Sequence, residues 1–318
     1  MADTTVVAVD QGKSGTRAEA RVDSGASVHG GAPGLSFARG SELGSDGVDA
    51  VVDAVASLRL PRPPDVVSVG TTAAPETRDE RREVAEVLRA RLGATRVLVT
   101  EDAVTAHLGA FGGGAGVVVS AGTGAIALWS DGATAVRIDG WGPILGDHGS
   151  GVAIGVAGLR AAFSAMDGRG PATSLVEPAG RHLGGLGLDA ARRLHAAGNP
   201  TELVSEFAVA VMRAAEDGDE VAGAIIATAA ADLATSAALA ARRALAAGEK
   251  PRCCAVGQVM RSPALRAAFT ERATELGMVV CHPPAGSVAG AMFLATTGPP
   301  PAFAGLVGVA EHSRQGAR

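Results

Sequence analysis

The sequence predicts an α/β fold of two domains, because strand patterns alternate with helical patterns and one such arrangement occurs twice. Residues 6–9 and 117–119 are apolar runs, and each leads into a glycine-rich turn followed by another strand pattern. This repeat, near the start of each half, indicates an internal duplication. We expect an N-terminal domain over residues 1–111, a C-terminal domain over residues 112–297 and a flexible tail over residues 298–318.

The first half reads as strands interleaved with helices. Apolar or alternating patterns predict strands at residues 6–9, 17–22, 26–30, 66–69 and 97–99. The spacing of its valines predicts a helix over residues 46–58 with one apolar face. Residues 78–92 form a charged amphipathic helix pattern, whose arginines we expect to face solvent. A further helix is expected to begin near Asp102.

The second half repeats the strand pattern and then becomes mostly helical, which predicts helical insertions in its domain. Strands are expected at residues 117–119, 125–129 and 134–138, with a strand end at residues 255–257. Helices are expected at residues 151–163, 190–195, 202–214, 222–247, 263–276 and 287–295. The last of these could pack on the N-terminal domain.

Composition limits the possible partners and compartment. The net charge of -5 and pI of about 5.8 give no basic footprint for nucleic acid. The longest apolar pattern, residues 222–247, is interrupted by Asp232, Arg242 and Arg243, which favours a buried helix over a membrane span. The three cysteines lack metal-ligand spacing, and the N-terminus lacks the pattern of a secretory signal. We therefore expect a cytoplasmic protein.

The first glycine-rich turn follows the carboxylate of Asp10, at the end of the strand pattern of residues 6–9. Backbone N–H groups of such a turn can bind phosphate oxygens, and the carboxylate can hold a hydrated Mg²⁺ ion. The candidate phosphate ligands here are Gly12, Lys13, Ser14 and Thr16. The sequence lacks the first glycine of a P-loop, and an ordinary hairpin turn with an exposed lysine is the alternative.

The second glycine-rich turn contains Gly122, Thr123 and Gly124, again after a buried strand pattern. Glycine turns are common in a chain with 44 glycines, so the pair of turns carries more weight than either one. Two such turns facing each other across a cleft could hold the β- and γ-phosphates of a nucleotide. The turn at Gly257 could place an adenine ring against the backbone.

Residues 140–151 are the most specific stretch, with an aromatic residue, a carboxylate and five glycines. A Trp141 ring could stack on a sugar, and Asp147 could accept hydrogen bonds from sugar hydroxyls. The alternative is a structural loop in which Asp147 caps the following helix.

Asp102 comes at the end of a predicted strand. A carboxylate in that position can accept the proton of a hydroxyl nucleophile during phosphoryl transfer. The alternative is that Asp102 caps a helix, which the local sequence alone favours.

Taken in order, these motifs resemble the N-acetylglucosamine kinase branch of the BadF/BadG/BcrA/BcrD ATPase family, within the actin/hexokinase superfamily. The resemblance covers residues 6–295 and is sharpest over residues 140–151. It implies a duplicated actin-like (ribonuclease H-like) ATPase fold with a central nucleotide cleft. It also implies ATP-dependent phosphorylation of a small amino sugar, such as N-acetylglucosamine or glucosamine, with ATP and Mg²⁺. A homodimer is expected, with neither nucleic acid nor membrane as a partner.

The resemblance also implies residue roles. Asp102 would be the base that acts on the sugar hydroxyl, usually the 6-OH. Asp147 and the backbone of the Gly140, Trp141 and Gly142 stretch would hold the sugar.

On the nucleotide side, Ser14 and Thr123 would contact the ATP phosphates, and the adenosine loop would begin at Gly257. The sequence departs from the family pattern at three positions, where Asn, Glu and Gly are usual: Glu101, His148 and Gln258. Residues 31–36 also lack an Asn that members often use to bind N-acetylglucosamine. Glucosamine, N-acetylmuramic acid and other hexose derivatives therefore stay open as substrates.

Two other functions stay open. An ATPase that drives electron transfer, as a dehydratase activator, would carry an iron–sulphur cluster on cysteines shared between subunits, and the chain has Cys253, Cys254 and Cys281. A non-catalytic sugar-binding sensor would bind sugar without turnover.

Overall fold

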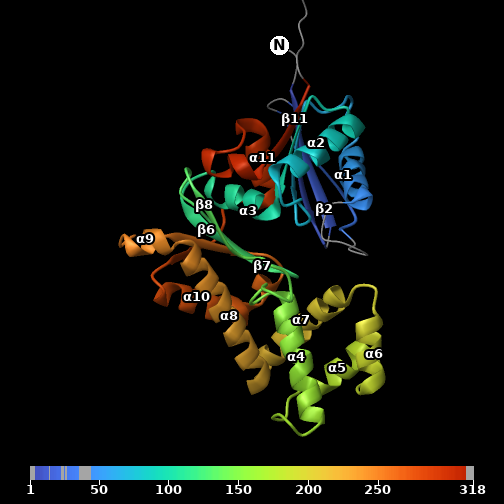
Figure 1. Ribbon diagram of the computed structural model, residues 1–318, viewed down its shortest axis with the longest axis vertical. Helices are drawn as coiled ribbons and strands as arrows, with labels where there is room; N and C mark the ends of the chain where they lie inside the picture. The colour runs from blue at the N-terminus through green and yellow to red at the C-terminus, as the bar shows by residue number, and fades with distance from the viewer. Residues whose placement is uncertain (1–3, 14, 23–24, 26, 36–43, 313–318) are drawn as a thin grey trace, which may run out of the picture. The chain divides into compact units, whose positions relative to one another are not determined.

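The computed structural model describes residues 4–13, 15–22, 25, 27–35 and 44–312 of the chain. Figure 1 shows its helices and strands.

The chain divides into two compact units. The N-terminal unit comprises residues 1–115, 130–135 and 283–318, and the C-terminal unit comprises residues 116–129 and 136–282. The chain thus returns to its first unit near its end.

The strands are β1 (Thr5–Gly12), β2 (Gly15–Val22), β3 (Val28–Ala32), β4 (Val66–Thr71), β5 (Arg96–Glu101), β6 (Gly116–Ala121), β7 (Ala125–Ser130), β8 (Ala135–Asp139), β9 (Arg252–Val256), β10 (Val279–Cys281) and β11 (Gly308–Glu311).

The helices are α1 (Ser45–Ser57), α2 (Arg78–Leu92), α3 (Asp102–Phe111), α4 (Gly151–Met166), α5 (Val176–Leu183), α6 (Leu188–Ala196), α7 (Pro200–Glu216), α8 (Glu220–Ala240), α9 (Arg242–Ala246), α10 (Pro263–Glu275) and α11 (Ser287–Thr297). Two 3₁₀ helices cover Val259–Arg261 and Pro301–Leu306.

The two sheets repeat one topology. The first has the strand order β11-β5-β4-β1-β2-β3 and the second has the order β10-β9-β6-β7-β8. Apart from β11, strands β6 to β10 therefore stand where β1 to β5 stand. In each sheet the central strand has a parallel neighbour, since β1 pairs with β4 and β6 pairs with β9. The predicted α/β fold with an internal duplication is confirmed, whereas the nucleotide cleft between domains stays a prediction.

The sequence patterns account for most elements. In α2, for example, Thr77 and Glu80 form a reciprocal capping box, and Gly93 ends the helix in the left-handed conformation. Ala85 and Leu88 of this helix are buried against the first sheet. The core of the first sheet is built mainly from valine and alanine.

The long helix predicted over residues 222–247 is two helices, because α8 ends at Ala240 and α9 begins at Arg242. By length and composition, α8 could cross a membrane. Its small and apolar residues, including Ile226, Ala230 and Leu233, are buried in the core of the C-terminal unit. Its packing against α4, α7 and α10 is that of a core helix.

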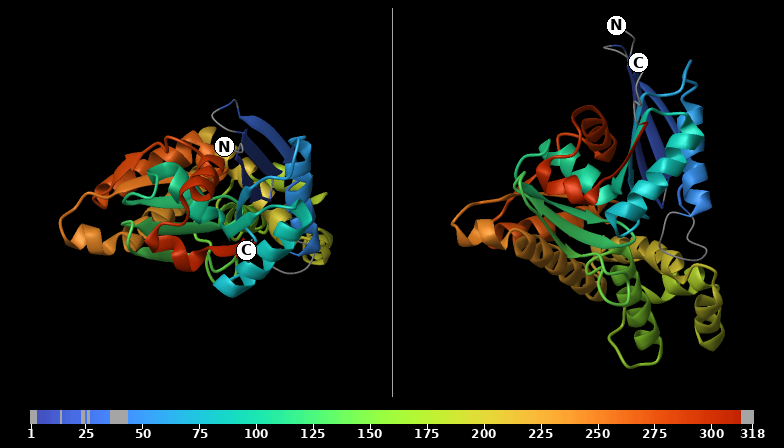
Figure 2. Two further views of the ribbon diagram at one scale, coloured as in Figure 1. Left: turned by 90° about the horizontal axis from the view of Figure 1, so that it is seen from above. Right: turned by 45° about the horizontal axis from the view of Figure 1, so that its top comes forward.

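The prediction of a flexible tail over residues 298–318 was wrong for residues 298–312. Strand β11 pairs antiparallel with β5, at the edge of the first sheet. The Phe303 ring is fully buried, with its centroid 5.1 Å from that of His107. Strand β11 has only four residues, which are too few for a recognisable strand pattern in the sequence. Only its pairing with β5 therefore reveals this strand. Helix α11, beside α3 in the N-terminal unit (Figure 2), also packs on β1.

The prediction that the arginines of α2 face solvent was wrong for Arg81, which is 1% exposed. Its guanidinium donates to the carbonyl oxygen of Pro75 at 2.6 Å and to that of Leu306 at 2.7 Å. It also donates to the Glu101 carboxylate at 2.6 Å. One buried cation therefore ties α2 to the end of β5 and to the segment that precedes β11.

Replacing Arg81 with Met should lower the free energy of unfolding by about 3–5 kcal/mol, because three acceptors lose a buried cationic donor. The matched control is Arg82→Met, since Arg82 is exposed and lies 4.0 Å from Asp79. The control should change stability by less than about 0.5 kcal/mol. Urea unfolding of the two variants measures the difference, and equal losses would contradict the role of Arg81.

Asp219 caps α8 and has four donors around its carboxylate. It accepts from the backbone N–H groups of Ala222 and Ser174 and from the hydroxyl groups of Ser174 and Thr173. Burial by itself raises the pKa of Asp219, but these hydrogen bonds outweigh it and lower the pKa to about 2.

The lowered pKa of Asp219 predicts a pH-dependent contribution to stability. Because the folded-state pKa lies below the ordinary pKa of 3.8 for an aspartate, the contribution is present above that pH and is lost as pH falls towards 2. Asp219→Asn should therefore cost about 1–2 kcal/mol near neutral pH. The cost should shrink in urea unfolding at about pH 3. A cost that does not change with pH would contradict this role of the ionised carboxylate.

Candidate active site

Two aspartates, Asp10 and Asp102, lie at one edge of the first sheet. Strands β1, β4 and β5 are parallel neighbours, in which Asp10 stands opposite Gly70 and Gly70 opposite Thr100. Asp102 follows two residues after Thr100, as the first residue of α3. Because parallel strands end at the same edge, Asp10 and Asp102 both lie at the carboxyl edge of this sheet.

The side of that sheet to which Asp10 points is also the side that carries α3, which begins at Asp102. Side chains alternate along a strand, so Asp10 points to the side of Ala8, which packs against Ala291 and Met292 of α11. A Cβ atom added to Gly70, opposite Asp10, would lie 2.3 Å from the Thr105 hydroxyl of α3. Helix α3, which Asp102 begins, therefore covers the side towards which Asp10 points.

Asp10 lies in an environment that favours a nearby cation. Burial raises the pKa of the Asp10 carboxyl, and the Arg17 guanidinium, with Nη1 at 3.3 Å from Oδ2, partly opposes this. A carboxylate that burial makes costly to ionise is stabilised by a positive charge beside it. This property fits the prediction that Asp10 holds an Mg²⁺ ion through water.

Asp102 is not the capping residue of α3. The N-cap position belongs to Glu101, whose carboxylate is bound by Arg81. Asp102 lies in the first turn, where the helix dipole favours a negative charge. The backbone carbonyl of Asp102 accepts from the Thr105 hydroxyl at 3.0 Å, which fixes that turn.

The first glycine-rich turn joins β1 to β2, as predicted, with Gly12 opposite Gly15. The Gly12 carbonyl accepts from the Leu35 N–H at 3.1 Å, which holds the segment after β3 against the turn. Ser14, a predicted phosphate ligand, lies outside the described residues. Thr16 is only 2% exposed and its hydroxyl donates to the Pro33 carbonyl at 3.0 Å. The Thr16 side chain thus has a structural role, and the geometry does not favour it as a phosphate ligand.

The second glycine-rich turn is fixed by the start of α4. The N–H groups of Gly151 and Val152 donate to the carbonyls of Gly122 and Thr123, at 2.8 and 3.2 Å. These bonds are made by the first N–H groups of the helix, which have no partner within it. Within the C-terminal unit, the second glycine turn is thus joined directly to the end of residues 140–151, the stretch predicted to bind the sugar.

Gly257 meets the same turn from β9. It has a φ of +107°, and a Cβ atom there would lie 2.0 Å from the carbonyl oxygen of Ala121. Only glycine fits this backbone-to-backbone contact. The predicted phosphate turn and the predicted start of the adenosine loop therefore lie together in one unit.

The predicted sugar-binding loop also reaches the second glycine turn. Asp147 is 8% exposed, and a Cβ atom added to Gly124 would lie 2.8 Å from its Oδ2 atom. Trp141, by contrast, is 65% exposed, with the Arg137 guanidinium 5.7 Å from its ring centroid. An exposed indole can stack on a ligand, while a buried carboxylate can only bind a ligand that enters the loop.

Asp139, the last residue of β8, is a site residue that the sequence patterns did not predict. It is 7% exposed and lies directly before the loop that contains Trp141 and Asp147. Its carboxylate accepts hydrogen bonds from both ends of that loop. The available signal was a carboxylate after a strand pattern and before a glycine-rich stretch, the signal that identified Asp10.

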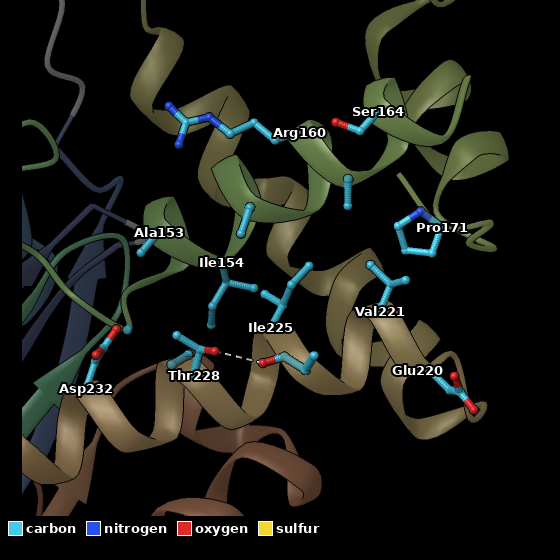
Figure 3. Close-up of a pocket in the computed structure, with 15 residues that line it drawn as sticks. Ala153, Ile154, Arg160, Ser164, Pro171, Glu220, Val221, Ile225, Thr228 and Asp232 are labelled. Carbon is cyan, nitrogen blue, oxygen red and sulfur yellow. Dashed lines mark hydrogen bonds between the residues drawn. The ribbon is translucent and has the colours of Figure 1, made fainter. Parts of the chain in front are cut away.

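A pocket of about 700 Å³ opens between α4 and α8 of the C-terminal unit (Figure 3). It is lined mainly by Ile154, Val221 and Ile225, with Glu220 towards one end and Asp232 towards the other. Gly149, which belongs to residues 140–151, also lines this pocket. Burial raises the pKa of Asp232, against the opposing charge of a nearby His148. Sequence periodicity cannot predict this pocket, because it arises from the spacing of two helices.

The three cysteines lie on β9 and β10, at one edge of the second sheet. Cys254 and Cys281 stand opposite each other on β9 and β10, with their sulphur atoms 2.9 Å apart. Burial raises the pKa of Cys253 to about 12 and also raises that of Cys254, so both favour the neutral thiol. Cysteines shared between subunits, which the electron-transfer alternative requires, stay a prediction.

Two sheets of one strand order, with glycine turns after their first strands and carboxylates at the strand ends, define an actin-like ATPase fold. The family model of the BadF/BadG/BcrA/BcrD ATPase family matches residues 8–295. The chain belongs to this family.

Two curated relatives match parts of the chain. A stretch of 111 residues is 34% identical to the N-acetylmuramic acid/N-acetylglucosamine kinase of Clostridium acetobutylicum and covers 34% of this chain and 36% of that protein. A stretch of 63 residues is 48% identical to the N-acetyl-D-glucosamine kinase of Dictyostelium discoideum and covers 20% of each chain. The matches thus span about a third and a fifth of the length of these relatives.

Among solved structures, the fold is similar to that of a candidate N-acetylglucosamine kinase from Chromobacterium violaceum. The TM-score is 0.73 at 23% sequence identity, over 92% of this chain and 99% of the other. At this identity the similarity shows the shared fold.

Gly257→Ala should lower the free energy of unfolding by more than about 2 kcal/mol, because its Cβ atom would overlap the Ala121 carbonyl and the backbone has a positive φ. The matched control is Gly218→Ala, where φ is +89° but a Cβ atom meets nothing within 4 Å. The control should cost only about 1 kcal/mol. Urea unfolding measures both, and equal costs would show that the contact with Ala121 is unimportant.

Proposed function

We propose that the chain is an ATP-dependent kinase of a small amino sugar, with Asp102 as the general base. The observation that carries the proposal is that Asp102 and Asp10 lie at one edge of the first sheet, and that α3, which begins at Asp102, covers the side to which Asp10 points. One carboxylate suits the acceptor hydroxyl and the other suits the cation that accompanies ATP. Membership of an ATPase family over residues 8–295 supports the use of ATP.

The reaction requires few groups from the protein. The sugar hydroxyl oxygen attacks the γ-phosphorus of ATP, the bond from that phosphorus to the ADP oxygen breaks, and the hydroxyl proton passes to the Asp102 carboxylate. Asp102 lies in the first turn of α3, which supports its negatively charged form before the transfer.

The phosphates would be bound by the two glycine turns. Gly12 and Lys13 belong to the first turn, and Gly122, Thr123 and Gly124 to the second. Asp10 would hold Mg²⁺ through water, and the bound ion would neutralise charge on the phosphate oxygens. That both turns bind one nucleotide in a central cleft is part of the proposal.

The sugar would be held by the loop from Gly140 to Asp147. The names of the two curated relatives point to N-acetylglucosamine as the first sugar to test, and one of them adds N-acetylmuramic acid. Because residues 31–36 lack an asparagine, the N-acetyl group would need a different donor from the family's usual one. Glucosamine and glucose complete the test panel.

The protein should release ADP in a sugar-dependent manner, and Asp102→Asn should lower kcat by about 10²–10⁴-fold, since the amide cannot accept the proton. Sugar affinity, measured by calorimetry, should change by less than about fivefold, because an amide keeps most of the shape and hydrogen bonding. A coupled ADP assay with the sugar panel measures both the activity and its substrate.

The matched control is Asp79→Asn, which removes an exposed carboxylate from the first turn of α2 and should leave kcat unchanged. Normal turnover by Asp102→Asn would show that Asp102 is not the base. Sugar binding without turnover in the unmodified protein would instead favour the non-catalytic sensor.

A further inference from the structure

The Asp139 carboxylate joins the two ends of the sugar-binding loop. Its Oδ1 atom accepts from the backbone N–H groups of Gly140 and Asp147, both at 2.8 Å. Its Oδ2 atom accepts from the backbone N–H of His148 at 2.9 Å and lies 3.0 Å from the Nδ1 atom of the same residue. Since a carboxylate only accepts, the His148 ring carries a proton on Nδ1.

The backbone of the loop is shaped around this carboxylate. Asp139 and Asp147 have left-handed φ angles of +65° and +59°, which are uncommon for residues other than glycine. A Cβ atom added to Gly146 would lie 2.2 Å from the Oδ1 atom of Asp139. Strained conformations of this kind persist only where surrounding contacts fix them, and they gather at functional sites.

Asp139 and the hydrogen bonds by which it holds the two ends of the loop are called the clamp below. The clamp requires the ionised form of Asp139. Burial by itself raises the pKa of Asp139, but the hydrogen bonds from the backbone of His148 and Asp147, the His148 ring and the Gly140 backbone outweigh it and lower the pKa. Asp232 of α8 is a further carboxyl group near this pair: burial and the charge of Asp139 raise its pKa, and the charge of His148 opposes them.

We propose that Asp139 and His148 are positioning residues that set the backbone of residues 140–148, and with it the Asp147 carboxylate, for sugar binding. This inference rests on the proposed function, because it gives Asp147 and the Trp141 loop the sugar as their ligand. Neither Asp139 nor the His148 ring needs to touch the sugar. Their effect passes through the N–H groups that fix the two ends of the loop.

Asp139→Asn tests the clamp with minimal change in shape. An amide offers one acceptor oxygen, and its NH2 group would face N–H donors where Oδ2 now accepts. We expect the KM for the sugar to rise about tenfold or more, while the KM for ATP changes by less than about threefold. The matched control is Asp219→Asn, whose carboxylate also has four donors in the same unit but caps α8.

His148→Glu and His148→Gln test the charge of the pair, since the two side chains have nearly the same size and shape. Glu places a third carboxylate against Asp139 and Asp232, so the KM for the sugar should rise about tenfold. The Gln amide can still donate to Asp139, so His148→Gln should stay within about twofold of the unmodified protein. A merely space-filling role of His148 predicts no difference between the two variants.

Hydrogen exchange of the loop amides provides a readout that needs no substrate. The amides of Gly140, Asp147 and His148 should exchange about tenfold faster or more in Asp139→Asn, and at the original rate in Asp219→Asn. If the unmodified protein phosphorylates no sugar in the panel, the proposed function fails, whatever the exchange data show.

The positioning proposal is overturned by different results. An active protein whose sugar KM is unchanged by Asp139→Asn would exclude it. So would an equal rise in sugar KM in Asp219→Asn, because the effect would then follow from lost stability. Unchanged exchange of the three amides in Asp139→Asn would overturn it even if no sugar is turned over.

Discussion

Parallel register is the constraint on which the first half of the site depends. Because β1, β4 and β5 run in the same direction and Asp10, Gly70 and Thr100 stand opposite one another, residues far apart in sequence arrive at one sheet edge. The side is fixed as well, since Gly70 lies so close to α3 that a Cβ atom there would overlap Thr105. The placement of the two aspartates thus follows from backbone pairing and from one close helix contact. The Arg81 guanidinium holds the end of β5 by donating to the Glu101 carboxylate.

The C-terminal unit brings its loops together by a different means, through direct contacts between backbones. The first N–H groups of α4 bind the carbonyls of the second glycine turn, and Gly257 lies against Ala121 in a space that excludes any side chain. Asp147 completes the group beside Gly124. Contacts of this kind leave little freedom for adjustment. A ligand site built from them is preorganised, which lowers the cost of ordering the loops when a ligand binds.

Much of this organisation could be predicted from the sequence, because apolar periodicity and glycine turns are local signals. The repeated strand–turn–strand pattern correctly predicted the duplicated fold, whereas the roles given to the carboxylates near the strand ends stay predictions. Three features could not be predicted this way. Strand β11 is defined by its pairing with β5, Arg81 is buried by partners distant in sequence, and the pocket beside α8 depends on helix spacing. Asp139 was overlooked for another reason: its importance lies in the donors around it, and a sequence does not show donors.

Those donors separate four at least partly buried carboxylates, Asp10, Asp139, Asp219 and Asp232, into two kinds. Burial by itself raises the pKa of each of the four, but backbone N–H groups converge on Asp139 and Asp219 and lower their pKa values, whereas burial prevails at Asp10 and Asp232. A carboxylate whose charge is already satisfied by the backbone is suited to hold a loop and is a poor ligand for anything else. One whose charge is left costly gains from a cation or a proton. The difference explains physically why Asp139 supports the loop while Asp10 is the better candidate for a metal.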